Sequence, residues 1–112
     1  METYTFEDVT GKFTLTVKKD FLNKCQEPPK YTINELNKDF NMLTYLHNET
    51  GPALICPKKP LSETMKELID NGEYFYTENN NQRVEFWLDG HCINRENTKL
   101  AEEMFNKWKG SL

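Results

Sequence analysis

Two runs near the start of the chain alternate apolar and polar residues, at positions 3–7 and 13–18. An alternation with a period of two is typical of β-strands that bury one face. The segment Asp8–Gly11 between the runs contains a glycine that permits a tight turn, which predicts a β-hairpin. Because such short connections join strands antiparallel, the chain is expected to build an antiparallel sheet.

Further short strands are separated by turn residues along the rest of the chain. They are predicted at 42–47, 53–56, 74–76, 84–88 and 91–93. The turn at 48–52 is expected to fold the first two into a hairpin, and an Asp-Gly pair at 89–90 is expected to reverse the chain after the fourth. The polar loop at 78–82, between the third and fourth strands, is predicted to be mobile.

Three segments carry apolar residues at helical spacing, and each has a capping residue. A Thr-x-x-Glu capping box opens a short helix at 33–40. Ser62 caps a second helix, which an Asn-Gly pair ends. Thr98 is expected to cap a C-terminal amphipathic helix, with Gly110 just beyond its last turn.

The 112 residues are expected to fold as a single domain, 1–112, of the α+β class. In this fold an antiparallel β-sheet carries two to three short helices packed on one face, including the C-terminal amphipathic helix. Large apolar residues from both kinds of element are predicted to be buried together. These are Phe13, Leu15, Val17, Leu36, Phe40, Leu68, Val84, Phe86, Leu88, Leu100, Met104 and Trp108.

Charge and cysteine content argue against several classes of protein. Eighteen acidic and fourteen basic residues give a net charge of −4, and no part of the chain concentrates the basic residues that nucleic-acid binding requires. Cys25, Cys56 and Cys92 form no C-x-x-C pair, which argues against a zinc knuckle or a redox pair. The sequence shows neither an apolar run of membrane-spanning length nor signal-peptide features, so a reducing cytoplasm is expected.

Two segments resemble one short repeat unit. The run Tyr45–Ile55 (YLHNETGPALI) resembles the His-Arg-Glu-Asp-Gly-Pro-Ala stretch of hairpin repeats that are common in tailed-phage and large-virus proteins. The run Glu85–His91 (EFWLDGH) resembles the Trp-Tyr-Leu-Asn-Gly-Lys stretch of the same repeat. In small phage proteins a helix like 102–108 often follows. The resemblance covers residues 43–56 and 84–109, about half of the chain.

The likeness departs from the usual pattern at two positions. Asn48 and Thr50 stand where the repeat has Arg and Asp, and a predicted helix separates the two segments. The chain therefore looks like a degenerate pair of hairpins inside a distinct domain. The repeat carries no known catalytic residues. The resemblance implies a small bacteriophage accessory protein that acts in the cytoplasm of the host bacterium.

Candidates for catalysis or metal binding are sparse. His91 and Cys92 are adjacent, but neighbours on a strand point to opposite faces, so a Cys–His pair would need Cys92 to meet His47 across the sheet. The two His and three Cys lack the paired spacing of a metal site. Carboxylates on the predicted helices are explained as solvated faces beside lysines, and no glycine-rich phosphate loop occurs. No enzyme activity, metal or cofactor is therefore expected.

The predicted strands hold more aromatic residues than one core face can accommodate. Because alternate positions 84, 86 and 88 take the core side, Trp87 is expected on the second face, together with Arg83 and Glu85. Trp87 then either packs beneath a helix or belongs to an exposed surface that binds a partner. The predicted binding residues are Tyr74, Tyr76, Asn80, Arg83, Glu85 and Trp87.

These observations favour a non-catalytic protein that binds a host bacterial protein, for example a host defence factor, and inhibits or redirects it. The alternative is a protein that binds or sequesters a small nucleotide signal, using Arg83, Arg95 and an aromatic stack. A membrane is not an expected partner, and the charge disfavours nucleic acid.

Overall fold

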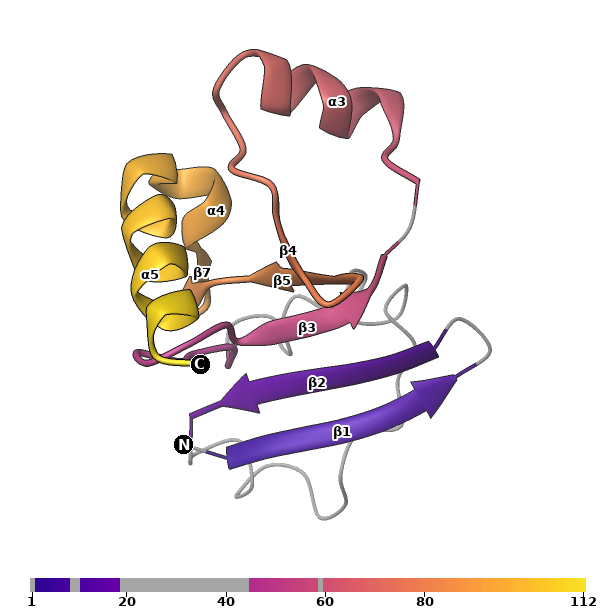
Figure 1. Cartoon of the computed structure of the whole chain (residues 1–112), viewed down its shortest axis with the longest axis vertical. Helices are drawn as coiled ribbons and strands as arrows, with labels where there is room; N and C mark the ends of the chain where they lie inside the picture. Colours follow the sequence, from indigo (N-terminus) through magenta and orange to yellow (C-terminus); the bar gives the residue numbers. More distant parts are fainter. Residues whose placement is uncertain (1, 9–10, 19–44, 59) are drawn as a thin grey trace.

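Five strands form one antiparallel sheet within residues 2–8, 11–18, 45–58 and 60–112, the parts of the chain that a computed structural model describes (Figure 1). Their order across the sheet is β1 (Glu2–Asp8), β2 (Gly11–Val17), β3 (Leu54–Pro57), β5 (Gln82–Glu85) and β4 (Thr77–Asn79). A two-stranded sheet joins β6 (Trp87–Leu88) to β7 (His91–Cys92). The described helices are α3 (Glu63–Asp70), α4 (Ile93–Glu96) and α5 (Thr98–Gly110). The predicted α+β class with an antiparallel sheet is confirmed.

The predicted N-terminal hairpin is also confirmed. Strands β1 and β2 pair over their full length, from Glu2 opposite Val17 to Asp8 opposite Gly11. Gly11 has a φ of +132°, which L side chains rarely adopt. A Cβ atom there would also lie 2.6 Å from Cγ of Pro57, at the end of β3. The glycine therefore permits both the turn and the close approach of β3.

Strand β3 confirms the strand predicted at 53–56, but its partners differ from those predicted. It pairs with β2 on one side and with β5 on the other. Because both edges of β3 are occupied, the predicted hairpin with the segment 42–47 does not form. Leu46, in the described part of that segment, instead forms an isolated bridge with Val17. Residues 42–44 lie outside the described residues.

The later two predicted helices are confirmed, with a correction to the caps of the last one. Ser62 caps α3 by accepting a backbone hydrogen bond at 3.2 Å, and the helix ends just before Gly72, whose φ is +74°. Helix α5 is capped by Asn97 and not by Thr98. The side chain of Asn97 accepts a hydrogen bond from the Leu100 N–H at 3.1 Å, so Thr98 already lies in the first turn.

The ends of two predicted elements also differ. Gly110 is the last residue of α5 rather than the residue beyond it, and Ser111 follows as the C-cap with an ordinary φ of −96°. The strand predicted at 91–93 stops at β7, because α4 begins at Ile93. The helix predicted at 33–40 lies outside the described residues.

A buried asparagine divides the strand predicted at 84–88. Asn94 is fully buried, and its side-chain oxygen accepts a hydrogen bond from the N–H of Phe86 at 2.7 Å. The carbonyl of Phe86 accepts a second hydrogen bond from the N–H of Ile93 at 2.8 Å. Since α4 takes both backbone groups of Phe86, β5 ends one residue before it and β6 begins one residue after it.

Hydrogen bonds to the same asparagine explain why the strand predicted at 74–76 does not form. The backbone N–H of Phe75 donates to the carbonyl of Asn94 at 2.8 Å, and the side-chain amide of Asn94 donates to the carbonyl of Phe75 at 2.6 Å. These bonds satisfy the backbone of Phe75 without a neighbouring strand. Pairing with β5 therefore begins only at Thr77.

The loop predicted at 78–82 is a two-residue turn. Strands β4 and β5 remain paired as far as Asn79 and Gln82. Asn80 and Asn81 have φ values of +54° and +62°, the left-handed conformation that a type I′ hairpin turn requires at both central positions. Asparagine tolerates this conformation better than most residues, which explains the run of asparagines. The turn predicted at 89–90 is confirmed, with positive φ at both residues.

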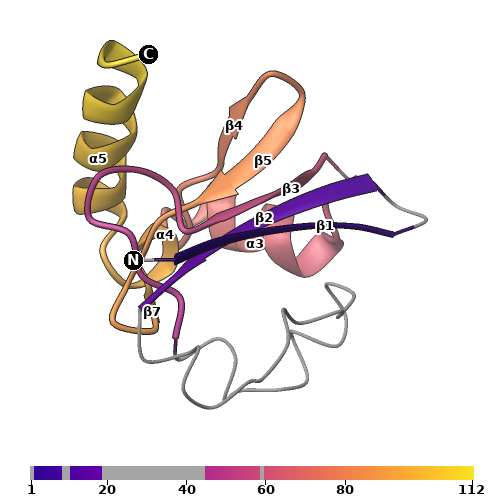
Figure 2. The ribbon, with the colours of Figure 1, turned by 90° about the horizontal axis from the view of Figure 1, so that it is seen from below.

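The two faces of the sheet bury different sets of residues. Val84 and Phe86 pack against α4 and α5, in a buried cluster with Ile93 and Ala101. The rings of Phe105 and Trp108 each meet the Phe86 ring edge to face, with centroids 6.3 Å apart. Figure 2 shows α5 projecting to one side of the strands, next to the β4–β5 hairpin.

The opposite face carries Phe13, Leu15 and Val17, all buried. Leu15 pairs with Leu54, and Leu54 pairs with Glu85. Directly paired residues of antiparallel strands share a face, so this group lies on the side of Glu85 and not on that of Phe86. The prediction of one common core face with all helices on it is therefore wrong. Helix α3 covers the Glu85 side, and α5 covers the Phe86 side.

The predicted core is confirmed in part. The fully buried members are Phe13, Leu15, Val17, Val84 and Phe86. The half-buried members are Leu68, Leu88, Leu100, Met104 and Trp108, most of which line surface cavities beside the helices. Leu36 and Phe40 lie outside the described residues.

Replacing Phe86 by alanine is expected to lower the free energy of unfolding by about 3–5 kcal/mol, because the ring fills the centre of the cluster beneath α5. Urea denaturation followed by circular dichroism measures the loss. Leu112→Ala is the matched control, since the Leu112 side chain is 74% exposed and its removal should change stability by less than about 0.5 kcal/mol. An unchanged midpoint for Phe86→Ala would contradict this assignment of the core.

Candidate functional site

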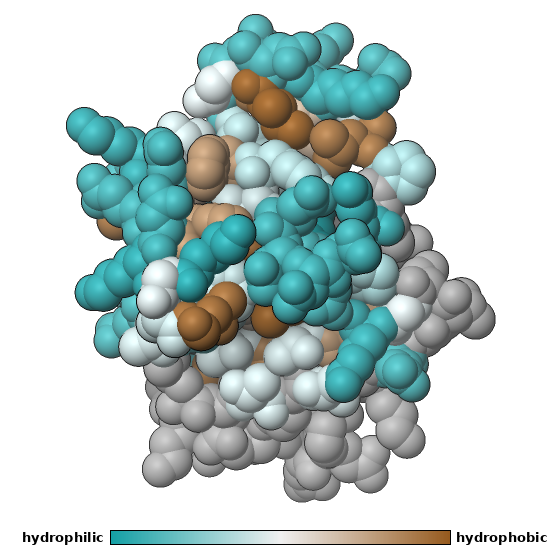
Figure 3. All heavy atoms as spheres, viewed as in Figure 1, coloured by the Kyte–Doolittle hydropathy of each residue, from teal (hydrophilic) through white to brown (hydrophobic). Residues whose placement is uncertain are grey.

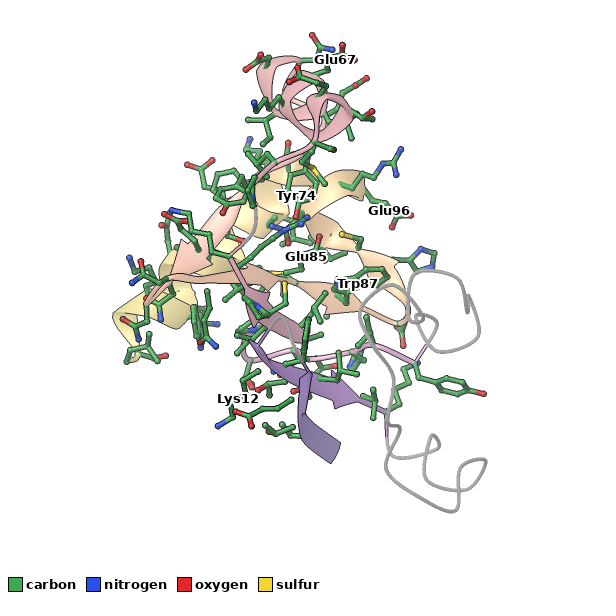
Figure 4. The ribbon with its side chains drawn as sticks, turned by 90° about the vertical axis from the view of Figure 1, so that its right-hand side faces the viewer. Lys12, Glu67, Tyr74, Glu85, Trp87 and Glu96 are labelled. Carbon is green, nitrogen blue, oxygen red and sulfur yellow. The ribbon has the colours of Figure 1, made fainter. Side chains whose placement is uncertain are left out.

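A cavity of about 290 Å³ lies between α3, the sheet face that carries Glu85, and the start of α4. We call it the α3 cleft. Its lining residues are Leu54, Cys56, Met65, Leu68, Tyr74, Arg83, Glu85, Trp87, Cys92 and Arg95. In Figure 4, Tyr74, Glu85 and Trp87 follow one another below α3, whereas Glu67 lies on the outer side of that helix. Figure 3 shows apolar side chains along the underside of α3 and hydrophilic ones above them.

The local sequence explains why α3 covers this cleft. Met65, Leu68 and Ile69 recur at helical spacing on one side of the helix, and all three are half-buried. No residue of α3 is fully buried. Helix α3 therefore lies over the sheet with an apolar underside that still faces open space in the cleft.

Three polar side chains form a hydrogen-bonded network inside the cleft. The Tyr74 hydroxyl donates to the carboxylate of Glu85 at 2.6 Å. The guanidinium of Arg83 donates to the Tyr74 oxygen at 2.8 Å and to the same Glu85 oxygen at 3.3 Å. The Glu85 side chain is only 11% exposed, so the ion pair with Arg83 offsets part of the cost of burying the carboxylate.

Burial and neighbouring charge fix the protonation of this network. Burial, followed by the charge of Glu85, raises the pKa of Tyr74 far above its usual value. Burial alone would lower the pKa of Arg83, but the charge of Glu85 and the contact with Tyr74 outweigh it and raise the pKa. Tyr74 therefore stays a neutral donor and Arg83 stays a cation at every physiological pH.

Cys92 lies beside the network as a protonated thiol. Its sulfur is 3.8 Å from the Glu85 carboxylate, and burial together with that charge raises its pKa to about 12. The neighbouring His91 points away into solvent and pairs with Glu96 at 3.1 Å. His47 accepts a hydrogen bond from the backbone N–H of Asp89. As expected from strand geometry, His91 does not pair with Cys92, and the alternative pairing of Cys92 with His47 does not form either, so no described histidine is placed to activate the thiol.

The cleft also contains donors that have no acceptor. Arg83 Nε and Trp87 Nε1 are buried, and each lacks a hydrogen-bond partner in the part of the chain that the structure describes. Leu54, Met65 and Leu68 supply apolar walls. The described residues of the cleft thus combine a fixed polar network with apolar surface, which is the composition of many binding sites.

Four of the six predicted binding residues line the α3 cleft, and two do not. Tyr74, Arg83, Glu85 and Trp87 are brought together there. Tyr76 lies outside the cleft, where its hydroxyl donates to Glu78 at 3.1 Å. Asn80 lies in the turn at the tip of the β4–β5 hairpin, also outside the cleft.

Sequence reasoning missed the role of Cys92 in this site, although a signal for it was present. A two-residue Asp-Gly hairpin turn pairs Leu88 with His91, and the next pair outward is Trp87 with Cys92. Directly paired residues lie on the same face of a sheet, so the turn alone places Cys92 beside Trp87. The walls formed by Met65 and Leu68 were predicted as apolar helix residues but not as part of a site.

A second cavity, of about 460 Å³, lies between the loop at 49–51 and α5. Trp108 and Met104 line it, and a Cβ atom at Gly51 would lie 3.1 Å from Cδ1 of Trp108. The absence of a side chain at Gly51 therefore lets the loop approach the indole closely. The side chain of Asn48 shapes the loop by accepting a hydrogen bond from the N–H of Thr50 at 3.0 Å.

Within the described ranges, no group of three or more His, Cys, Asp or Glu side chains is placed to hold a metal ion. None of the helices in those ranges is long and apolar enough to cross a membrane. Comparison with known proteins found no matching family model, curated protein or solved structure.

Tyr74→Phe is expected to reduce the free energy of unfolding by about 1–3 kcal/mol, because it removes the donor to a buried carboxylate and the acceptor of a buried guanidinium. Urea titration provides the measurement. Tyr76→Phe removes a hydroxyl whose partner Glu78 is exposed, and should cost less than about 0.5 kcal/mol. Equal losses in the two variants would show that the network does not stabilise the fold.

Cys92 is expected to react slowly with iodoacetamide at pH 8, roughly a hundredfold or more below its rate in urea, because the folded chain holds it as a thiol. Mass spectrometry of the Cys92 peptide measures the rate, and the urea sample is the control.

The same thiol should make folding stability depend on pH. The pKa of the cysteine is about 9.0 when unfolded and about 12 when folded, so the free energy of unfolding should fall as pH rises through this window. Cys92→Ala should weaken this pH dependence of the free energy of unfolding. Rapid labelling of Cys92 in the folded protein would contradict its assignment as a buried, protonated thiol.

Proposed function

We propose that this protein is a non-catalytic accessory protein of a bacteriophage, which binds a host bacterial protein and inhibits or redirects it. The α3 cleft is the contact site in this proposal. The resemblance of two segments to phage hairpin repeats supports the proposed bacteriophage origin. The properties of the cleft support the mode of action, because they combine a fixed polar network with incompletely covered apolar surface.

The observation that carries the proposal is the position of Trp87. Its indole lines the cleft beside the network of Tyr74, Arg83 and Glu85, and its N–H has no acceptor in the described part of the chain. A rigid aromatic group beside apolar walls is the usual composition of a binding hot spot. A side chain of the partner would fill the space below α3 and contact this indole.

A small nucleotide is the second candidate ligand, and one observation favours it. The residues that such a ligand would need, Arg83, Arg95 and an aromatic ring, line one cavity. A panel of nucleotides tested by thermal denaturation separates the two functions, since a ligand that binds only the folded chain raises its Tm.

Trp87→Ala is expected to weaken binding of the host protein by roughly 2 kcal/mol or more, about thirtyfold in Kd, because it removes the aromatic anchor of the cleft. The partner is first recovered from bacterial lysate on the immobilised wild-type chain, and its Kd for each variant is then measured by calorimetry. Circular dichroism verifies that the variant is folded.

Tyr76→Ala is the matched control for this experiment, since it removes an aromatic side chain that lies outside the cleft. It should leave the Kd within about twofold of wild type. The proposal fails if no stoichiometric partner is recovered, or if Trp87→Ala and Tyr76→Ala weaken binding equally.

A further inference from the structure

The distribution of arginine in this chain is uneven. The sequence contains two arginines, Arg83 and Arg95, and both line the α3 cleft. The other twelve basic residues are lysines, and none of the lysines in the described ranges lines the cleft. Arginine differs from lysine in its planar fork of donors, which matches the two oxygens of a carboxylate or a phosphate.

The two arginines have different surroundings. Arg83 is held inside the cleft by Glu85 and Tyr74, so its charge is already balanced. Arg95 is exposed on α4 and forms no ion pair with any residue that the structure describes. With one carboxylate and two guanidinium groups, the cleft lining carries a net positive charge in a chain whose total charge is −4.

Hydrogen-bonding capacity in the cleft is also unbalanced. The Glu85 oxygen already accepts from Tyr74, Arg83 and Cys92. By contrast, the guanidinium of Arg95 is exposed at the cleft and supplies its accessible donors, because Arg83 Nε and Trp87 Nε1 are buried beyond the reach of a ligand. A group rich in acceptors would pair with the guanidinium of Arg95, which has no ion-pair partner among the described residues.

We infer that the α3 cleft recognises an oxyanion, a carboxylate or a phosphate monoester, that is attached to an apolar or planar body and is bound by Arg95 at the mouth of the cleft. The body lies against Leu54, Met65 and Leu68, within a volume of about 290 Å³. This inference rests on the proposed function, because it names the chemical group that the same cleft takes from its partner. An acidic side chain supplies a carboxylate, and a nucleotide supplies a phosphate.

Binding of small probes to the full chain tests the inference. Indole-3-acetate represents the carboxylate, adenosine monophosphate represents the phosphate, and adenosine is the neutral match of the second probe. Calorimetry should detect binding of at least one anion, with adenosine bound roughly tenfold or more weakly. Binding of only one anion identifies which source of the oxyanion the cleft accepts. Failure of both anions to bind, or equal binding of adenosine, overturns the inference.

Variants of Arg95 test whether this residue binds the oxyanion. Arg95→Gln should lower affinity for the bound anion roughly tenfold or more, because a charge-assisted hydrogen bond is lost. Arg95→Lys keeps the charge but loses the fork, so its affinity should be intermediate. Lys99→Gln changes the net charge equally at a residue outside the cleft and should have less than about a twofold effect. Equal effects of Arg95→Gln and Lys99→Gln would overturn the assignment.

These experiments distinguish a failure of this inference from a failure of the proposed function. If Trp87→Ala abolishes capture of the host protein while Arg95→Gln captures it normally and no anion binds, the inference is wrong and the proposed function stands. If an anion binds through Arg95 but no host protein is recovered, the inference stands and the proposed protein partner is wrong. Protein stability in each variant is verified by its Tm.

Discussion

The fully buried amide of Asn94 determines how the C-terminal half of the described chain is arranged. It accepts from the N–H of Phe86 and donates to the carbonyl of Phe75 and to the hydroxyl of Thr77, so one side chain connects α4 to β5 and to the start of β4. A buried polar group is tolerated only when its hydrogen bonds are made, and here all three partners are supplied by backbone or by a buried hydroxyl. The chain can therefore leave the main sheet at Phe86 without unsatisfied backbone groups, and the following Trp87 faces the α3 cleft.

The cleft depends on a second buried polar group, the carboxylate of Glu85. Its negative charge is balanced by Arg83 and its oxygen is also bonded to Tyr74, so the acid holds both side chains in place. An ion pair of this kind adds little net stability, because desolvation offsets most of the attraction. Its effect is to fix the geometry of the cleft, and a site fixed in advance loses less ordering entropy if a ligand binds to it.

Much of this arrangement follows from local sequence patterns. Alternation predicted β2, and the turn at 48–52 predicted β3 after it. Ser62 predicted the start of α3, and parity along the strand predicted at 84–88 placed Arg83, Glu85 and Trp87 on one face. The assignment of faces between distant strands was not predictable, because it depends on the register that places Leu54 opposite Glu85. Asn94 was also missed, since an asparagine after a short strand usually indicates a turn, and only tertiary contacts make it a buried connector. Tyr76 was misplaced because the segment before β4 is not a strand.

The chain contains two tryptophans, and the structure places each beside a different cavity. Trp87 lines the α3 cleft next to the thiol of Cys92 and the carboxylate of Glu85, whereas Trp108 packs on Phe86 across the sheet and lines the cavity behind Gly51. A chain in which Trp108 is replaced by phenylalanine would thus retain a single tryptophan, located in the cleft, which light that tyrosine does not absorb would excite selectively. The tryptophan emission of that chain would report the polarity of the cleft, without an attached dye and without a tryptophan signal from the opposite side of the sheet.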